Sequence, residues 1–555
     1  MTAVTEDIIS RALPGATDHG EGVVTFALYA PRKKTVHLSA SFNDWDWHGW
    51  PLEQREEGFW VASAQLPRGK CEYQFVVDGS IVICDPYAQE INVAPGEEPR
   101  AVIDVGRPIY QWENEHWQRP NLRDLIVYEM HVGDFSPEGT FQGVIDRLDY
   151  LQDLGINCIE FMPLYESVPR AYWGYEPNYF LAVRKSYGPM EDLLRLIDAA
   201  HGRGIAVILD MVLNHTGHHH PFMKLYPWDE SPWYGNPIGE PNQFGLPTLD
   251  FTKPATNAFV RDVQAYWLRV FHIDGFRYDY LAGLGANKDG QGLPYLMRTA
   301  RDIRPEAYLF GECIPEDPDL TRDSGLSGVW HTRFRIAIEC LIRERDEEPY
   351  KWDDFEATVR SFDPTTQGYH CGSFMLNYGE CHDDIRIIRS LRDEIGFPED
   401  VAYRKSALAA TILMTVPGEP MLWQGQEWGE ATVRQQKPNK IHWEVLETDE
   451  GRCLRQHYAD MVRLRRERTS TRTDNFAFDL IDAARRVVVY HRWLGDADQV
   501  LVAANFSREK QTVTIEFPAH GPWRNRSTHD LLNVTGSVEL TLEPYCAVVF
   551  TSGVS

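Results

Sequence analysis

The stretch Gly275-Phe276-Arg277-Tyr278-Asp279 decides the fold of this chain, because a short apolar run ends there in a charged pair. Strands of a parallel sheet are buried on both faces and therefore give near-continuous apolar runs. The sequence thus indicates a parallel sheet whose strand ends carry polar groups. Three further runs reach an acid at or just beyond their ends: Val207-Ile208-Leu209-Asp210, Leu309-Phe310-Gly311-Glu312, and Leu376-Asn377-Tyr378 before Glu380-Cys381-His382-Asp383.

Strand-like and helix-like segments alternate from residue 123 to about 470. Helical patterns over 141–154, 190–203 and 257–271 lie between the apolar runs, and such repeated units predict a parallel sheet. Seven clear strands and a weaker one near 328–334 match a TIM (β/α)8 barrel. A doubly wound open sheet is the alternative, but no G-x-G-x-x-G follows the first strand. The clear strands are Leu125–Val132, Ile156–Leu164, Ile205–Val212, Gly275–Tyr280, Tyr308–Cys313, Phe374–Tyr378 and Met421–Gln424.

β-rich segments flank the predicted barrel. Residues 1–105 contain short strands separated by turn residues, which predicts an N-terminal β-sandwich. Residues 106–122 are expected to be a linker, and the barrel to span 123–470. Strand-like runs return over 471–555 and predict a C-terminal β-domain, most simply a second sandwich. Inside the barrel, 216–250 is a long loop after the third strand, a place where loops are usually functional.

The composition argues against several classes of function. A formal net charge of −27 repels nucleic-acid backbones and disfavours anionic membrane surfaces, yet it leaves a neutral sugar as a substrate. No run of about 18 apolar residues predicts a transmembrane helix. The nine cysteines form no C-x-x-C pair, and residues 1–15 lack the apolar run of a signal peptide, so a reduced cytoplasmic location is expected. No pattern specifies an oligomeric state.

Three acids are expected to meet at one end of the barrel. Active sites of TIM barrels lie at the carboxyl ends of the strands, where Asp279, Glu312 and Asp383 fall. Glycoside hydrolysis needs two carboxylates, one to protonate the leaving oxygen and one to attack the sugar or activate water. Arg277 lies two residues before Asp279, on the same face of the strand, and would orient an attacking carboxylate. A structural salt bridge would account for one such acid, but not for an ordered set on several strands.

These motifs resemble four conserved regions of the α-amylase superfamily, glycoside hydrolase family 13, over most of the chain. The N-terminal segment resembles the β-sandwich that precedes the barrel in branching, debranching and trehalose-forming members, through Ser41-Phe42-Asn43-Asp44-Trp45. The four barrel motifs are Asp210-Met211-Val212-Leu213-Asn214-His215, Gly275-Phe276-Arg277-Tyr278-Asp279, Phe310-Gly311-Glu312 and His382-Asp383.

The resemblance implies a double displacement that retains the α-anomer. Asp279 would be the nucleophile, Glu312 the general acid and then base, and Asp383 a third acid that binds substrate hydroxyls. No cofactor is implied for the chemistry and no metal ligands are assigned, although a structural Ca²⁺ near the loop after the third strand is possible, with Asn214 as a conceivable ligand. The implied substrate-binding residues are Tyr175, Asp210, His215, Arg277 and His382.

The leading hypothesis is hydrolysis of α-1,4-glucosidic bonds in starch, glycogen or maltooligosaccharides. A maltooligosyltrehalose trehalohydrolase is the second, since Tyr128-Glu129-Met130-His131-Val132 resembles a stretch of those enzymes. An α-glucan transferase, branching or α-1,6-debranching activity shares the same acids. Ala282 and Gly283 stand where many α-amylases have Lys and His, so the acceptor side differs from theirs. A non-catalytic glucan-binding protein is the hypothesis from another class.

Overall fold

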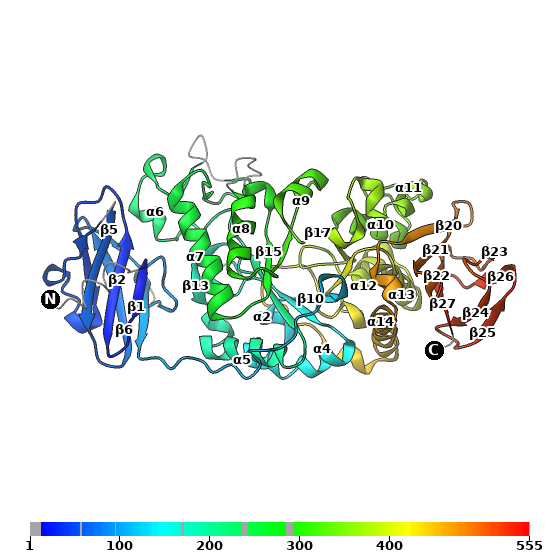
Figure 1. Cartoon of the computed structure of the whole chain (residues 1–555), viewed down its shortest axis with the longest axis horizontal. Coiled ribbons are helices and arrows are strands. Elements are labelled where there is room, and N and C mark those ends of the chain that lie inside the picture. Colours follow the sequence, from blue (N-terminus) through cyan, green and yellow to red (C-terminus); the bar gives the residue numbers. More distant parts are fainter. Residues whose placement is uncertain are drawn as a thin grey trace.

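The structure is a computed structural model that describes residues 13–55, 58–94, 96–167, 171–235, 242–284 and 292–553. Three parts follow one another along its long axis (Figure 1): N-terminal sheets, a central barrel with its helices, and C-terminal sheets. Some predictions from the sequence concern residues outside the described ranges. These residues are 1–12 for the N-terminal segment, 236–241 for the long loop and 554–555 for the C-terminus.

Eight parallel strands close into a barrel, in which the last strand pairs with the first. The prediction of a TIM barrel is therefore confirmed, and the open-sheet alternative is wrong. The segment near 328–334 gave a weak signal because its strand is only three residues long. The strands are β10 (Val127–Met130), β11 (Cys158–Phe161), β14 (Ala206–Met211), β15 (Gly275–Tyr278), β16 (Tyr308–Gly311), β17 (Gly328–Trp330), β18 (Met375–Tyr378) and β19 (Glu419–Trp423).

Helices surround the barrel and cover its strands. The predicted helix over 141–154 is two helices, because Arg147 leaves the helical conformation, with φ −117° and ψ 4°. The second of them ends at Gly155, which has φ 95°, a conformation that favours glycine. The main helices are α3 (Phe141–Ile145), α4 (Leu148–Leu154), α5 (Met190–His201), α7 (Pro254–Val270), α8 (Leu293–Ile303), α10 (Thr332–Arg343), α13 (Glu399–Thr415) and α14 (Asp449–Glu467).

The N-terminal part is a β-sandwich of two antiparallel sheets. Phe26 of one sheet meets Tyr73 of the other edge-on, with ring centroids 4.9 Å apart, within a buried core. Tyr87 joins the sandwich to the barrel by donating a hydrogen bond from its hydroxyl to Asp262 of α7, at 3.2 Å. One sheet contains β1 (Gly15–Asp18), β2 (Val23–Tyr29), β5 (Phe59–Gln65) and β4 (Glu53–Gln54); the other contains β3 (Val36–Ala40), β6 (Gly69–Val77), β9 (Arg100–Val105), β8 (Ile91–Asn92) and β7 (Ile81–Ile83).

The chain between β9 and η4 (Leu122–Asp124) is extended and lies against the barrel. Trp112 stacks on His272 at 4.1 Å between ring centroids, and Trp117 stacks on His201 at 4.3 Å. The carboxylate of Asp198 on α5 accepts hydrogen bonds from two backbone amides of this segment, at 2.9 Å each. The segment predicted as a linker is thus held against the barrel.

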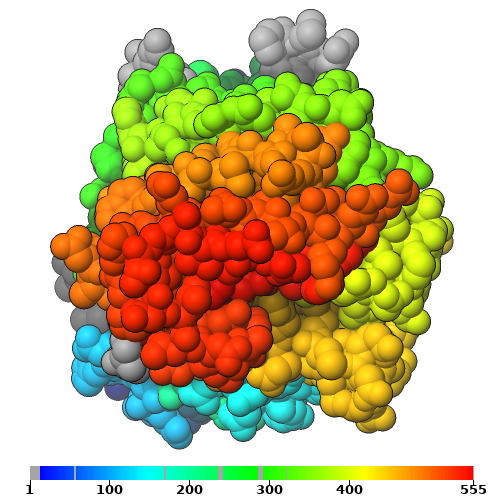
Figure 2. All heavy atoms as spheres, turned by 90° about the vertical axis from the view of Figure 1, so that its right-hand side faces the viewer, coloured from blue at the N-terminus to red at the C-terminus, as the bar shows by residue number. Residues whose placement is uncertain are grey.

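The C-terminal part holds a six-stranded and a two-stranded antiparallel sheet. Figure 2 looks onto this end, where the orange-to-red sheets cover much of the visible face. Arg492 anchors them to α13 by donating a hydrogen bond to the carbonyl of Thr415, at 2.6 Å. The strands are β20 (Phe476–Asp482), β21 (Val487–Leu494), β22 (Asp498–Asn505), β27 (Cys546–Ser552), β24 (Gly521–Asn525) and β25 (Leu531–Val534), with β23 (Gln511–Glu516) and β26 (Ser537–Leu542) forming the pair.

No helix in the described part of the chain has the length and apolar character needed to span a membrane.

Candidate active site

The acids predicted from the sequence lie at one mouth of the barrel. Asp210 belongs to the end of β14, Asp279 follows β15 directly and Glu312 follows β16 directly. Asp383 lies on the loop after β18. Because all eight strands are parallel, their carboxyl ends share one face of the barrel.

Arg277 is the centre of the site. Its guanidinium is fully buried, and Nη1 lies 2.8 Å from Oδ1 of Asp210 and 2.8 Å from Oδ1 of Asp279. Its Nη2 lies 3.0 Å from Oε2 of Glu312. The ring of Trp330 lies beside the guanidinium, 4.4 Å from Cζ to the ring centroid. One arginine therefore holds three carboxylates in a fixed arrangement.

Both oxygens of Asp279 accept hydrogen bonds. Arg277 contacts Oδ1, and the amide of Asn214 donates to Oδ2 at 3.0 Å. Asn214 also donates to the backbone carbonyl of Asp279, at 3.2 Å. The side chain of Asp279 remains 14% exposed, so one edge of this oriented carboxylate stays open to a ligand.

The resemblance also makes Asn214 a conceivable calcium ligand. Its Oδ1 is buried and accepts no hydrogen bond, and a carbonyl oxygen is a suitable ligand for Ca²⁺. Calcium, however, takes six to eight oxygens, usually with several carboxylates. Among the described residues no group of three acidic, imidazole or thiol ligands forms around Asn214. Calcium binding beside Asn214 therefore stays a prediction.

Glu312 has surroundings that suit a proton donor. Burial raises the pKa of its carboxyl, the contact with Arg277 opposes that effect, and the negative charge of Asp279 adds to it, for a net rise. Its Oε2 also accepts a hydrogen bond from the backbone amide of Tyr280, at 3.2 Å. Glu312 can thus hold a proton beside an oriented carboxylate.

Asp210 lies deeper than the other acids, and its side chain is 2% exposed. Burial raises its pKa to about 7, although Arg277 favours the charged form. The hydroxyl of Tyr175 donates a hydrogen bond to Oδ2 of Asp210, at 2.5 Å. Asp210 therefore positions Arg277 and Tyr175.

Tyr175 and two histidines border the acids. The Tyr175 ring stacks on His382, with centroids 5.1 Å apart and planes 17° apart. His215 donates from Nε2 to the carbonyl of Tyr175 at 2.8 Å, while Asn242 donates to its Nδ1 at 3.1 Å. Burial lowers the pKa of His215, which agrees with a neutral ring that donates through one nitrogen and accepts through the other.

His382 is held between two carboxylates. Its Nδ1 lies 2.5 Å from Oε1 of Glu129 on β10, and its Nε2 lies 3.3 Å from Oδ2 of Asp383. Burial would lower the pKa of His382, but Asp383 and Glu129 together raise it well above its ordinary value. With Cys381, Glu129 and His382 form the one metal-type grouping in the described ranges. Its carboxylate and imidazole are too close to be two ligands of one ion and are instead a hydrogen-bonded pair.

Arg434 contacts Asp383 and was not identified from the sequence. Its Nη2 lies 2.5 Å from Oδ1 of Asp383, and its Cζ lies 5.4 Å from the ring centroid of Trp173. Arg434 belongs to an irregular segment between η11 (Gln426–Trp428) and η12 (Trp443–Glu447). Neither a motif nor a periodicity marks it, and only the fold brings it 51 residues back to Asp383.

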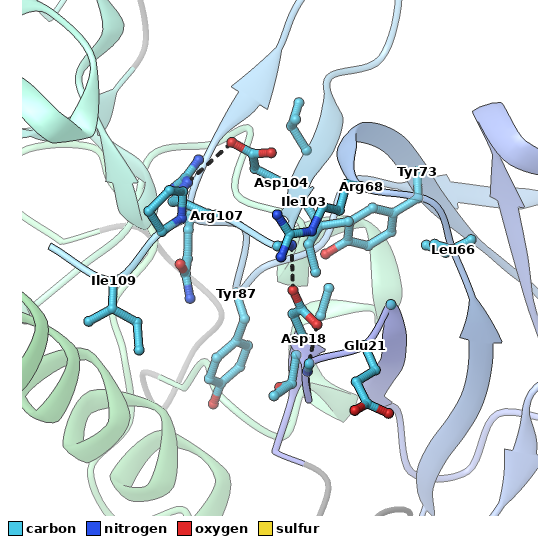
Figure 3. Close-up of a pocket in the computed structure, with 18 residues that line it drawn as sticks. Asp18, Glu21, Leu66, Arg68, Tyr73, Tyr87, Ile103, Asp104, Arg107 and Ile109 are labelled. Carbon is cyan, nitrogen blue, oxygen red and sulfur yellow. Dashed lines mark hydrogen bonds and ion pairs between the residues drawn. The ribbon is translucent and has the colours of Figure 1, made fainter.

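A cavity of about 1100 Å³ lies between the N-terminal sandwich and the segment after β9 (Figure 3). Asp18 at its wall accepts a hydrogen bond from the backbone amide of Gly106, at 2.6 Å, and Arg107 lies 3.5 Å from Asp104. Its lining includes none of the predicted site residues. This cavity belongs to the junction between sandwich and linker.

The family description "Alpha amylase, catalytic domain" matches residues 40–236 and 241–476, which is most of the chain. The chain belongs to the alpha-amylase family. It is accordingly an enzyme of that family, a glycoside hydrolase or a related transferase.

Several curated and solved proteins of the family are similar to this enzyme. A malto-oligosyltrehalose trehalohydrolase from Saccharolobus solfataricus is 27% identical over 439 residues, covering 74% of each chain. A 1,4-alpha-glucan branching enzyme from Nitrosomonas europaea is 25% identical over 550 residues, covering 88% of this chain and 72% of its own. A pullulanase from Anoxybacillus sp. LM18-11, solved with maltotetraose, has a TM-score of 0.81 at 19% identity, over 100% of this chain and 89% of its own, and supports the fold alone.

Proposed function

We propose that this enzyme hydrolyses α-1,4-glucosidic bonds in starch, glycogen or maltooligosaccharides and retains the α-anomer. The observation that carries the proposal is the double contact of Arg277, at 2.8 Å to Asp279 and 3.0 Å to Glu312. Both oxygens of Asp279 accept hydrogen bonds, whereas the carboxyl of Glu312 has a raised pKa. An oriented nucleophile beside a protonated acid is what retaining glycoside hydrolysis requires.

In the first step, Asp279 attacks the anomeric carbon while Glu312 gives its proton to the departing glycosidic oxygen. The bond to that oxygen breaks, and a covalent glycosyl-enzyme forms on Asp279. In the second step, the Glu312 carboxylate takes a proton from water as the water oxygen attacks the same carbon and Asp279 leaves. Two inversions at one carbon leave its configuration unchanged.

The remaining site residues bind the sugar in this proposal. The stacked rings of Tyr175 and His382 offer a flat wall for a glucosyl ring. Asp383 accepts hydrogen bonds from sugar hydroxyls. His215, whose neutral ring is held by Tyr175 and Asn242, offers a further polar edge.

A maltooligosyltrehalose trehalohydrolase is the second candidate, because relatives of that name are similar over about three quarters of both chains. The two functions share the acids and differ on the acceptor side. Tyr280, which follows Asp279 in the chain, meets the 53% exposed Phe244 edge-on at 5.2 Å between ring centroids. Transfer, branching and α-1,6 cleavage would also be decided on this side.

The test is to incubate the enzyme with maltohexaose, amylopectin, pullulan and maltopentaosyl-trehalose and to resolve the products over time. Short maltooligosaccharides from the first two, released as α-anomers by proton NMR, support the proposal. Trehalose from the last substrate alone favours the second candidate, and products longer than maltohexaose indicate transfer. The matched control is Asp279→Asn, which should abolish turnover. If the wild type binds glucan but turns over none of the substrates, the hypothesis of a non-catalytic glucan-binding protein is supported instead.

A cytoplasmic location is part of the proposal and rests on the cysteines. All nine lie in the described ranges and are free thiols, most of them buried. Reduced cysteines are typical of intracellular proteins.

A further inference from the structure

Asp383 differs from the other two acids in how it is held. Asp279 and Glu312 directly follow strands, whereas Asp383 lies on a loop and its side chain is 47% exposed. Its two oxygens are held separately: Oδ2 lies 3.3 Å from Nε2 of His382, and Oδ1 lies 2.5 Å from Nη2 of Arg434. The orientation of this carboxylate therefore depends on two cationic side chains rather than on a strand.

The segment that carries Arg434 is anchored at both ends by buried carboxylates. At its start, Glu430 accepts hydrogen bonds from the backbone amides of Ala431 at 2.7 Å and Thr432 at 2.8 Å. At its end, Asp134 accepts one from the backbone amide of Asn439, at 2.8 Å. Both carboxylates are buried. This anchoring fixes the position from which Arg434 reaches Asp383.

The side chain of Arg434 is itself supported on the site wall. Its guanidinium lies over Trp173, at 5.4 Å, which restricts its orientation although 43% of the side chain is exposed. Trp173 in turn meets His382 edge-on, with centroids 5.5 Å apart. The carboxylate of Asp383 is thus contacted by two side chains, Arg434 and His382, that both pack against Trp173.

The two contacts leave Asp383 able to bind a sugar. An ionised carboxylate has about four acceptor positions, two on each oxygen. His382 and Arg434 use one position on each oxygen and leave one on each for a substrate hydroxyl. Burial would raise the pKa of Asp383, but the charges of His382 and Arg434 hold it well below its usual range, so that the acceptor stays ionised.

We propose that Arg434 is a positioning residue that fixes the carboxylate of Asp383 for two substrate hydroxyls. The inference rests on the proposed function, because it assigns Arg434 a part in the same site. It predicts that Arg434 acts on turnover through Asp383. A carboxylate held through one oxygen can rotate, and a misplacement of about 1 Å costs on the order of 10²-fold in rate.

The experiment compares kcat and KM on maltohexaose for the wild type and Arg434→Ala, Arg434→Gln and Arg434→Lys. We expect Arg434→Ala to lower kcat by about 10- to 100-fold while KM changes by less than about threefold. Arg434→Lys should recover most of the loss because it restores a charged donor, and Arg434→Gln should recover less. The matched control is Lys437→Ala, which removes a positive charge from the same exposed segment without a contact to Asp383 and should leave kcat unchanged.

A double-mutant cycle shows whether the effect passes through the third acid. In an Asp383→Asn background, Arg434→Ala should change kcat by less than about threefold, because the carboxylate to be positioned is gone. An equal loss in both backgrounds, or full activity of Arg434→Ala beside an active wild type, would overturn the inference alone. Absence of cleavage by the wild type on every α-glucan would overturn the proposed function, and this inference with it.

Discussion

Arg277 contacts Glu312 through Nη2, at 3.0 Å, and its other terminal nitrogen, Nη1, contacts Asp279 at 2.8 Å. A buried arginine that contacts both Asp279 and Glu312 couples the charges of these two carboxyls. Arg277 stabilises the negative charge on Asp279, while burial still raises the pKa of Glu312.

Replacing Arg277 should damage both activity and stability. Arg277→Ala leaves buried carboxylates without their cation, and breaking a buried pair costs about 3–5 kcal/mol. We expect kcat/KM to fall by at least about 10³-fold and the melting temperature to drop. Arg277→Lys keeps the charge but loses the planar fork, so it should remain more than about 10²-fold impaired. If Arg277→Lys has near-normal kcat/KM, the simultaneous contact of one guanidinium with Asp279 and Glu312 is not needed.

The raised pKa of Glu312 should set the alkaline limb of the activity profile. In the proposed mechanism Glu312 acts first in its protonated form, so the rate should fall as pH rises through its folded-state pKa, which lies above that of an ordinary glutamate. Glu312→Gln should lower turnover of glucans by about 10²–10⁴-fold. With an aryl maltoside whose leaving group needs no proton, the loss should be much smaller and the alkaline limb should disappear. An equal loss on both substrates would contradict the assignment.

Tyr175 should act mainly through its ring. Tyr175→Phe keeps the stacking on His382 and loses one hydrogen bond to Asp210, worth about 0.5–1.5 kcal/mol, so kcat/KM should fall by up to about tenfold. Tyr175→Ala also removes the wall and should cost about 10–100-fold more. The comparison is made on maltohexaose. If kcat/KM falls as far for Tyr175→Phe as for Tyr175→Ala, the hydroxyl and not the ring is the group that matters.

Glu419 should make the fold less stable as pH rises. It is buried on β19, where burial raises its pKa to about 8, and its Oε2 has no hydrogen-bond partner. The folded state then binds a proton that the unfolded state releases near pH 4.5, so the free energy of unfolding falls between those pH values. Glu419→Gln cannot ionise, and its melting temperature should fall less than the wild type's from pH 5.5 to 8.5, by roughly 1–4 °C.

The control for Glu419 is Glu539→Gln, which removes the same charge from an exposed position on β26. It should follow the wild-type pH dependence. If Glu419→Gln and Glu539→Gln behave alike, the buried carboxyl does not control the pH dependence of stability.

The sequence by itself determined the barrel, because strands buried on both faces require apolar runs, and those runs ended in acids where parallel strands meet. Runs such as 206–211 and 275–278 needed no long-range information to be recognised, whereas β17 with three residues was only a weak signal. The placement of Asp279 and Glu312 at the mouth followed from the same rule.

Only the tertiary structure decided how the charges are paired. Arg434 reaches Asp383 across 51 residues, and Glu129 on the first barrel strand holds His382 across 253. No local pattern encodes such contacts, because an irregular segment has no periodicity and because a pairing depends on which strand ends and loops the closed barrel brings together. The sequence pointed to the candidate acids, and the fold supplied the cations and donors that set their charge and orientation.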